Sequence, residues 1–170
     1  MAQTIIGRER EINQLEAIVA SGKAELVAIY GRRRIGKTFL VKEFFKNKFD
    51  FYATGIFEGR KADQLTAFND ALNQNSKKPI PKAQTWMQAF MQLRDYLSSL
   101  KKQRLIVFLD ELPWFDTRAS QFLKAFEWFW NSWGSAQEDL MLIVCGSATS
   151  WMIHNLVKDT RGFHNRLTRR

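Results

Sequence analysis

Eight consecutive residues have the types and spacing needed to hold a phosphate chain. The segment Gly31-Arg32-Arg33-Arg34-Ile35-Gly36-Lys37-Thr38 matches the pattern G-x-x-x-x-G-K-[ST] at every fixed position. Its two glycines permit backbone conformations that a Cβ would block, so that consecutive amides can point at one anion. We expect Lys37 to reach the β- and γ-phosphates and Thr38 to offer its hydroxyl to Mg²⁺. The segment, with the adjoining Phe39, is therefore predicted to bind a nucleotide.

Two adjacent carboxylates could supply the rest of the chemistry. Asp110 and Glu111 directly follow the apolar run 105–109, which is a Walker B arrangement. A carboxylate at a strand end beside a phosphate-binding loop can hold Mg²⁺, while the next residue can activate the attacking water. We predict that Asp110 is a metal residue, with Thr38, and that Glu111 is the general base. In isolation such a pair would only solvate the end of its strand.

Small polar residues follow another apolar run, 140–145. Ser147 could contact the γ-phosphate or orient water there, and Thr149 could do so instead. Ser147 is the preferred candidate because it lies nearer to the end of the predicted strand. His154 and His164 lack the spacing of metal ligands, so no zinc site is expected.

Alternating strands and helices are needed to position these residues. Strands are predicted at 26–30, 49–54, 105–109 and 140–145. Helices are predicted at 12–19, after residue 38, around 65–72, at 86–100 with Thr85 as its cap, and at about 118–133. The last helix has apolar residues on more than one face, so it is either buried on two sides or covered by a partner or another segment. The alternation predicts an α/β fold in which a parallel sheet is flanked by helices in three layers, with ligands at the strands' carboxyl ends.

Length and composition are consistent with one domain over residues 1–170. The 170 residues are 45% hydrophobic, enough for one substantial core. The sequence has no long apolar span and no signal peptide, so a cytoplasmic protein without membrane contact is expected. A single cysteine, Cys145, lies in an apolar run and is interpreted as a small core residue.

The formal charge of +9 has two main sources. Arginines and a lysine of the loop form one cluster, which a triphosphate would explain. Lys158, Arg161, Arg166, Arg169 and Arg170 form the other. This terminal cluster is either a set of solvated charges, the preferred interpretation, or a surface for a nucleic-acid backbone.

A match to the guanine-reading motif N-K-x-D also needs an explanation. Asn47-Lys48-Phe49-Asp50 fits its letters, but it lies between the loop's helix and the second strand, before the Walker B pair. In GTPases the motif follows a later strand. We interpret the match as a coincidence and expect adenine as the base.

Several segments together resemble the archaeal-type ATPases, within the AAA+/STAND branch of P-loop NTPases. They are the phosphate-binding loop, 108–111 and the segments 6–11, 145–152 and 161–167. The resemblance implies an ASCE-type sheet with strand order 5-1-4-3-2. It also implies an adenine pocket lined partly by Ile5, Ile6 and Gly7, and a sensor role for Ser147.

In such proteins an arginine after the fourth strand can complete the site, often in a neighbouring subunit. Arg161 and Arg166 are the candidates here, with Arg166 as the predicted catalytic residue. The family continues into a fifth strand, a helical lid and a C-terminal region that can contact DNA. Residue 170 precedes all three, so the resemblance implies that this sequence is a fragment of a longer protein.

Three functions follow from these observations. The first is an ATPase that binds ATP with Mg²⁺ and hydrolyses it with Glu111 as base, slowly without the lid, and a homo-oligomer would supply the arginine. The second is a nucleotide-gated switch or scaffold that holds ATP or ADP with little turnover. The third is an ATP-linked regulator that binds DNA through the C-terminal region.

Overall fold

The computed structural model describes residues 7–157, and a four-stranded parallel sheet forms its centre. The strands are β1 (Glu25–Tyr30), β2 (Phe51–Thr54), β3 (Leu105–Asp110) and β4 (Leu140–Gly146). Their order in the sheet is β1-β4-β3-β2, which confirms the implied order for these four strands. Every residue of β3 and β4 is buried, because helices cover both faces of a parallel sheet.

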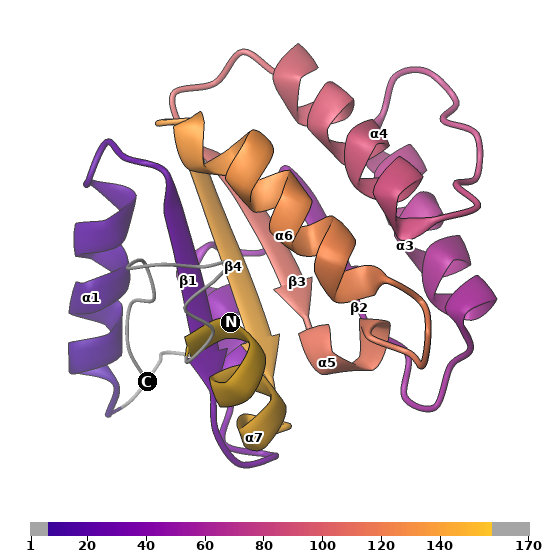
Figure 1. Ribbon diagram of the computed structural model, residues 1–170. Helices are drawn as coiled ribbons and strands as arrows, with labels where there is room; N and C mark the ends of the chain where they lie inside the picture. The colour runs from indigo at the N-terminus through magenta and orange to yellow at the C-terminus, as the bar shows by residue number, and fades with distance from the viewer. Residues whose placement is uncertain (1–6, 158–170) are drawn as a thin grey trace.

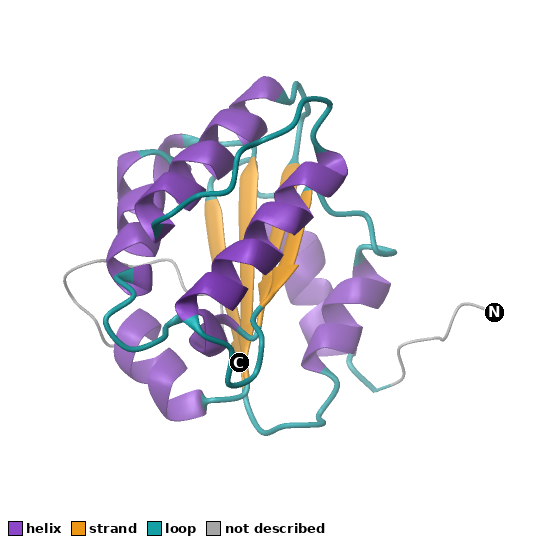
Figure 2. Cartoon of the chain, turned by 90° about the vertical axis from the view of Figure 1, so that its right-hand side faces the viewer, coloured by secondary structure: helices purple, strands orange, loops and turns teal. Residues whose placement is uncertain are grey.

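Seven helices of the described residues surround the sheet. They are α1 (Glu9–Val19), α2 (Lys37–Phe44), α3 (Lys61–Asn75), α4 (Trp86–Ser99), α5 (Leu112–Phe115), α6 (Phe122–Ser132) and α7 (Thr149–Met152). A 3-10 turn covers Gly134–Ala136, and a π-helical turn covers Ile153–Val157. Helices α1 and α2 pack on one face of the sheet, and α3, α4 and α6 on the other, as Figures 1 and 2 show. The predicted three-layer α/β fold is confirmed.

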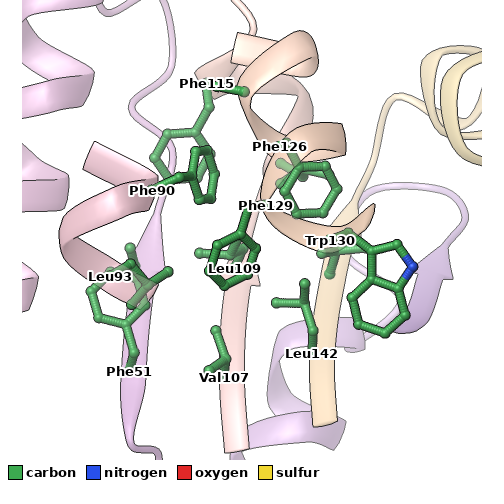
Figure 3. Close-up of a cluster of buried hydrophobic side chains, with 14 of the residues drawn as sticks. Phe51, Phe90, Leu93, Val107, Leu109, Phe115, Phe126, Phe129, Trp130 and Leu142 are labelled. Atoms are coloured by element: carbon green, nitrogen blue, oxygen red, sulfur yellow. The ribbon is translucent and has the colours of Figure 1, made fainter. Parts of the chain in front are cut away.

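The larger core lies between the sheet and the α4–α6 layer. Phe90 of α4 contacts Phe129 of α6 with ring centroids 5.3 Å apart, and Phe126 with centroids 5.8 Å apart. Beneath these rings lie Leu109 and Leu142 of the two central strands (Figure 3). Aromatic side chains bury large areas, so this layer accounts for much of the burial that stabilises the sheet.

Helix α6 is shorter than predicted. It begins at Phe122 instead of about residue 118, because Ala119 and Gln121 have the left-handed φ values 55° and 61°. The Ser120 hydroxyl accepts the Phe122 N–H at 3.3 Å, in place of a helical carbonyl. The apolar residues of α6 are buried or half-buried against the core, which agrees with burial on two sides.

Two further differences concern the start of β2 and the segment after β3. The strand predicted at 49–54 begins at Phe51, because side chains take the place of backbone partners at Asp50. Its carbonyl accepts from the Tyr96 hydroxyl, and its carboxylate accepts the Ile106 N–H. The one-turn helix α5, directly after the acidic pair, was not predicted. No described helix is long and apolar enough to cross a membrane.

The register of the sheet determines where the chemistry lies. Tyr30 pairs with Gly146, and Thr54 pairs with Asp110. The segments that follow these four residues therefore all leave the sheet at the carboxyl ends of its strands, as predicted for a parallel arrangement.

Candidate functional site

The phosphate-binding loop, residues 31–38, joins β1 to the first turn of α2. Gly36 is the N-cap of α2 with a left-handed φ of 78°. Gly31 has φ 151°, and a Cβ there would lie 2.9 Å from Cδ1 of Ile35. Glycine is therefore required at both ends of this turn, and the amides at the helix start remain open to an anion.

Lys37 lies under the loop with its ammonium inside the turn. Its Nζ donates to the carbonyls of Gly31, at 3.0 Å, and Arg32, at 2.7 Å, and the residue is only 7% exposed. A buried cation held only by carbonyl dipoles is suited to an anionic ligand.

Thr38 and Asp110 are in direct contact across the end of the sheet. The Thr38 hydroxyl donates to Asp110 at 2.8 Å from Oδ2 and 3.1 Å from Oδ1. The Glu111 N–H donates to Oδ1 at 3.0 Å. Burial raises the pKa of Asp110 above its ordinary 3.8, although both hydrogen bonds favour the ionised form. A cation placed here would relieve that cost.

Glu111 is the N-cap of α5, and its side chain contacts the residue that follows β4. It has the left-handed φ 48°, which is uncommon for a residue with a side chain. Its Oε2 accepts from Ser147 twice, from the hydroxyl at 3.0 Å and from the backbone N–H at 3.3 Å. The structure thus brings the predicted base and the predicted sensor into contact.

Lys37, Thr38 and Glu111 border one pocket of about 440 Å³. Its lining consists of Arg33, Arg34, Gly36, Lys37, Thr38, Phe39, Glu111 and Trp114. Three cations and one carboxylate face the same space, which suits a polyanion that reacts with water.

A second, mainly apolar pocket of about 320 Å³ lies between α1 and β1. Leu15, Ile18, Val27 and Leu40 contribute apolar surface, and Lys37 and Ile35 connect this pocket to the loop. Arg8 also lines it and donates to the Ile35 carbonyl. A flat ring system attached to a phosphate chain would fit this combination.

Other predicted site residues are placed as follows. Gly7 is exposed with φ 75° and does not line the apolar pocket. Arg32 is exposed on the loop and does not line the polar pocket, while Thr149 opens α7. The remaining predicted residues, Ile5, Ile6, Arg161 and Arg166, lie outside the described residues.

Two aromatic residues of the site were not predicted. Trp114 lines the polar pocket, and Phe57 lies 5.4 Å from it between ring centroids. Phe57 is 57% exposed, unusual for a phenylalanine. Phe57 lies in a loop and Trp114 in the one-turn helix α5, so no spacing pattern in the sequence could indicate that they would meet.

The residues present fit a magnesium ion. Thr38 and Asp110 offer hydroxyl and carboxylate oxygens, the ligands that Mg²⁺ prefers. Within residues 7–157, no group of three or more histidine, cysteine or acidic side chains could hold a metal alone. Phosphate and water oxygens would therefore complete the shell, as is usual for Mg²⁺ at nucleotide sites.

Sequence comparison finds one family. The profile of an ATPase domain predominantly from Archaea matches residues 5–168. An uncharacterized ATP-binding protein of Methanocaldococcus jannaschii is 46% identical over 43 residues, which are 25% of this chain and 73% of that protein.

Solved structures with the same fold are also found. A Walker-type ATPase of Pyrococcus abyssi has a TM-score of 0.64 and 18% identity, over 96% of this chain and 53% of that one. Cdc6p from Pyrobaculum aerophilum has a TM-score of 0.60 and 18% identity, over 98% and 46%. Drosophila ORC bound to DNA has a TM-score of 0.53 and 10% identity, over 94% and 89%. The chain spans about half the length of the two archaeal structures.

Proposed function

The chain belongs to the family of ATPase domains found predominantly in Archaea, and from that membership we propose that it binds ATP with Mg²⁺ and hydrolyses it. The observation that carries this proposal is the pocket shared by Lys37, Thr38 and Glu111. It combines a phosphate-binding loop with a carboxylate, the two parts that in-line attack of water on a phosphate uses.

Each residue has a role that follows from its position. Loop amides and Lys37 bind the β- and γ-phosphates, because they form the positive end of α2. Thr38 and Asp110 hold Mg²⁺, which neutralises phosphate charge when bound. Glu111 accepts the proton of the attacking water, and Ser147 keeps its carboxylate oriented.

We propose adenine for the base and the apolar pocket beside α1 as its place. That pocket presents hydrophobic side chains to the faces of a ring and connects to the loop through Lys37. Ile5, Ile6 and Gly7, implied earlier as adenine neighbours, directly precede Arg8 of this lining.

A single-turnover assay with labelled ATP and excess protein tests the hydrolysis. Glu111→Gln should bind ATP with unchanged affinity and lose turnover, since an amide cannot accept the proton. Lys37→Ala should lose binding. Glu16→Gln, an exposed change on α1, is the matched control and should behave as the parent does. Hydrolysis by Glu111→Gln at the parental rate would exclude Glu111 as the base.

A nucleotide-gated switch with little turnover is the second candidate. The contact that favours it is again Ser147 on Glu111, because its two donors occupy the carboxylate oxygen Oε2, which would otherwise accept from a water. The release rates of bound ATP and ADP, compared with the single-turnover rate, separate the two candidates. ADP release far faster than the chemical step supports an enzyme whose rate is limited by chemistry. Very slow release of both ATP and ADP supports a switch.

We also propose that the protein is a cytoplasmic ATPase that forms homo-oligomers and acts on DNA. A neighbour's Arg166 would then reach the γ-phosphate, a contribution of about 10³ to 10⁵ in rate in P-loop enzymes. The rate per chain should rise with protein concentration. A fast rate that does not depend on concentration would contradict a shared site.

The DNA proposal has support from the similar fold of ORC, and titration of a labelled duplex at two salt concentrations tests it.

A further inference from the structure

The middle arginine of the loop has aromatic neighbours from two other segments. The Arg33 guanidinium carbon lies 5.3 Å from the ring centroid of Phe57 and 5.8 Å from that of Trp114. Phe57 follows β2, and Trp114 belongs to α5. Three stretches of chain that are distant in sequence therefore meet at one guanidinium.

The same arginine borders the reaction space. Arg33 and Trp114 line the 440 Å³ pocket together with Lys37 and Glu111. Lys37 is buried and bound to loop carbonyls, whereas Arg33 is exposed and its planar head lies against rings. A guanidinium can leave an exposed aromatic face for a phosphate, because the phosphate offers charge-assisted bidentate hydrogen bonds and the ring does not.

We propose that Arg33 is the residue that distinguishes ATP from ADP, and that Phe57 and Trp114 are positioning residues which hold its guanidinium at the pocket when no terminal phosphate is bound. This inference rests on the proposed nucleotide function. Glu111 lines the same pocket and is the proposed base, so a transferring phosphate bound in that pocket would have both side chains as neighbours. A diphosphate would leave Arg33 on its rings.

A consequence follows for the segment after β2. Phe57 loses its cation partner when Arg33 turns to a terminal phosphate, and the environment of the Trp114 indole changes in the same step. The presence of the third phosphate is thus transmitted to a surface loop within one chain.

Equilibrium binding of Mg·ADP and of a non-hydrolysable Mg·ATP analogue tests the selectivity. Arg33→Ala should weaken the ATP analogue at least tenfold and ADP less than threefold. Arg33→Lys should recover only part of the difference, since an ammonium is not bidentate. Arg10→Ala is the matched control: it removes the same charge from an exposed residue of α1 that lines neither pocket, so the ratio of the two affinities should stay parental.

Fluorescence tests the positioning role. The chain has six tryptophans, and the analogue-dependent change in emission should disappear in Trp114→Phe, which keeps an aromatic face and should retain selectivity. The double variant Phe57→Ala/Trp114→Ala should lose selectivity without a comparable loss of ADP affinity.

One outcome would overturn the proposal: an affinity ratio in Arg33→Ala equal to the parental ratio, whether both nucleotides keep their affinity or both are weakened equally. Failure of the proposed function gives a different result, because the parent chain itself would then bind neither nucleotide. Retained selectivity in the double aromatic variant would remove the role of Phe57 and Trp114 alone.

Discussion

Ser147 holds the carboxylate of Glu111 with both donors it has, the hydroxyl at 3.0 Å and the backbone N–H at 3.3 Å from Oε2. The two residues follow adjacent strands, β3 and β4, so the sheet itself fixes their separation. A proposed base in this position has a fixed direction before any ligand arrives.

Ser147→Ala should lower the single-turnover rate by about 10- to 100-fold, with nucleotide affinity changed less than threefold. The hydroxyl bond is lost, and a base that is free to rotate contributes less to proton transfer. Rapid-quench measurement gives the rate, and equilibrium binding gives the affinity. A faster variant would show that Ser147 restrains Glu111, which is the result expected of a switch.

Asp110→Asn should stabilise the nucleotide-free chain at neutral pH and weaken its binding of Mg·ATP. Burial raises the Asp110 pKa, so the folded chain holds this proton more tightly than the unfolded chain does. The contribution of Asp110 to the free energy of unfolding therefore falls as pH rises from 3.8 through the folded-state pKa. Urea unfolding of parent and variant at about pH 4 and about pH 7 measures it.

The difference in the free energy of unfolding between Asp110→Asn and the parent should be larger at the higher pH. Exposed Asp70→Asn is the control and should show no such increase. A difference that is constant between the two pH values would mean that ionised Asp110 costs the fold nothing.

Asp50→Ala should destabilise the fold by about 1–3 kcal/mol and leave nucleotide affinity unchanged. The Asp50 carboxylate is buried, accepts the Ile106 N–H at 2.8 Å and pairs with Lys102. Asp50 precedes β2, so it lies at the amino-terminal ends of the parallel strands, whereas the phosphate-binding loop lies at their carboxyl ends. Chemical denaturation and nucleotide titration check the two halves of this prediction.

Asp95→Ala is the matched control, because it breaks the exposed Asp95–Arg94 pair and should cost under about 1 kcal/mol. A specific loss of guanine nucleotide binding in Asp50→Ala would revive the N-K-x-D motif, which we interpret as a coincidence.

Gly55→Ala should lower both stability and turnover. An added Cβ would lie 2.6 Å from the Glu111 carbonyl and 2.7 Å from Cβ of Trp114, so the backbone that carries Glu111 must shift. Overpacking of this kind typically costs about 1–3 kcal/mol. Thermal unfolding and single-turnover rates measure the effect, with Thr54→Ala as a neighbouring change that adds no volume. Parental turnover in Gly55→Ala would show that the site tolerates movement of Glu111.

The order of elements could be predicted from the sequence because its signals are local. Continuous apolar runs such as 105–109 and 140–145 are typical of strands covered on both faces, and the loop pattern locates the start of α2. The Thr85 cap is confirmed, with its hydroxyl accepting the Gln88 N–H at 3.2 Å.

The details of the site depend on contacts between distant segments, which no local pattern encodes. Glu111 and Ser147 were predicted separately, and only the register of β3 and β4 shows that they touch. The backbone conformation before α6 could not be predicted either. Gln121 and Ala119 adopt φ values that their residue types rarely favour, so the start of α6 could not be placed correctly.

The order of strands in the sheet also has a consequence for how the chain folds. Within the described residues β1 pairs with β4 alone. The backbone groups of residues 25–30 can therefore form their strand hydrogen bonds only after residues 141–146 are present. Such a long loop closure is slow, and during synthesis β1 must stay unpaired until nearly all of the described chain has been made. Cys145 lies buried in β4 and can report this step. Its protection from pulsed alkylation should appear late on the ribosome, together with the capacity to bind nucleotide.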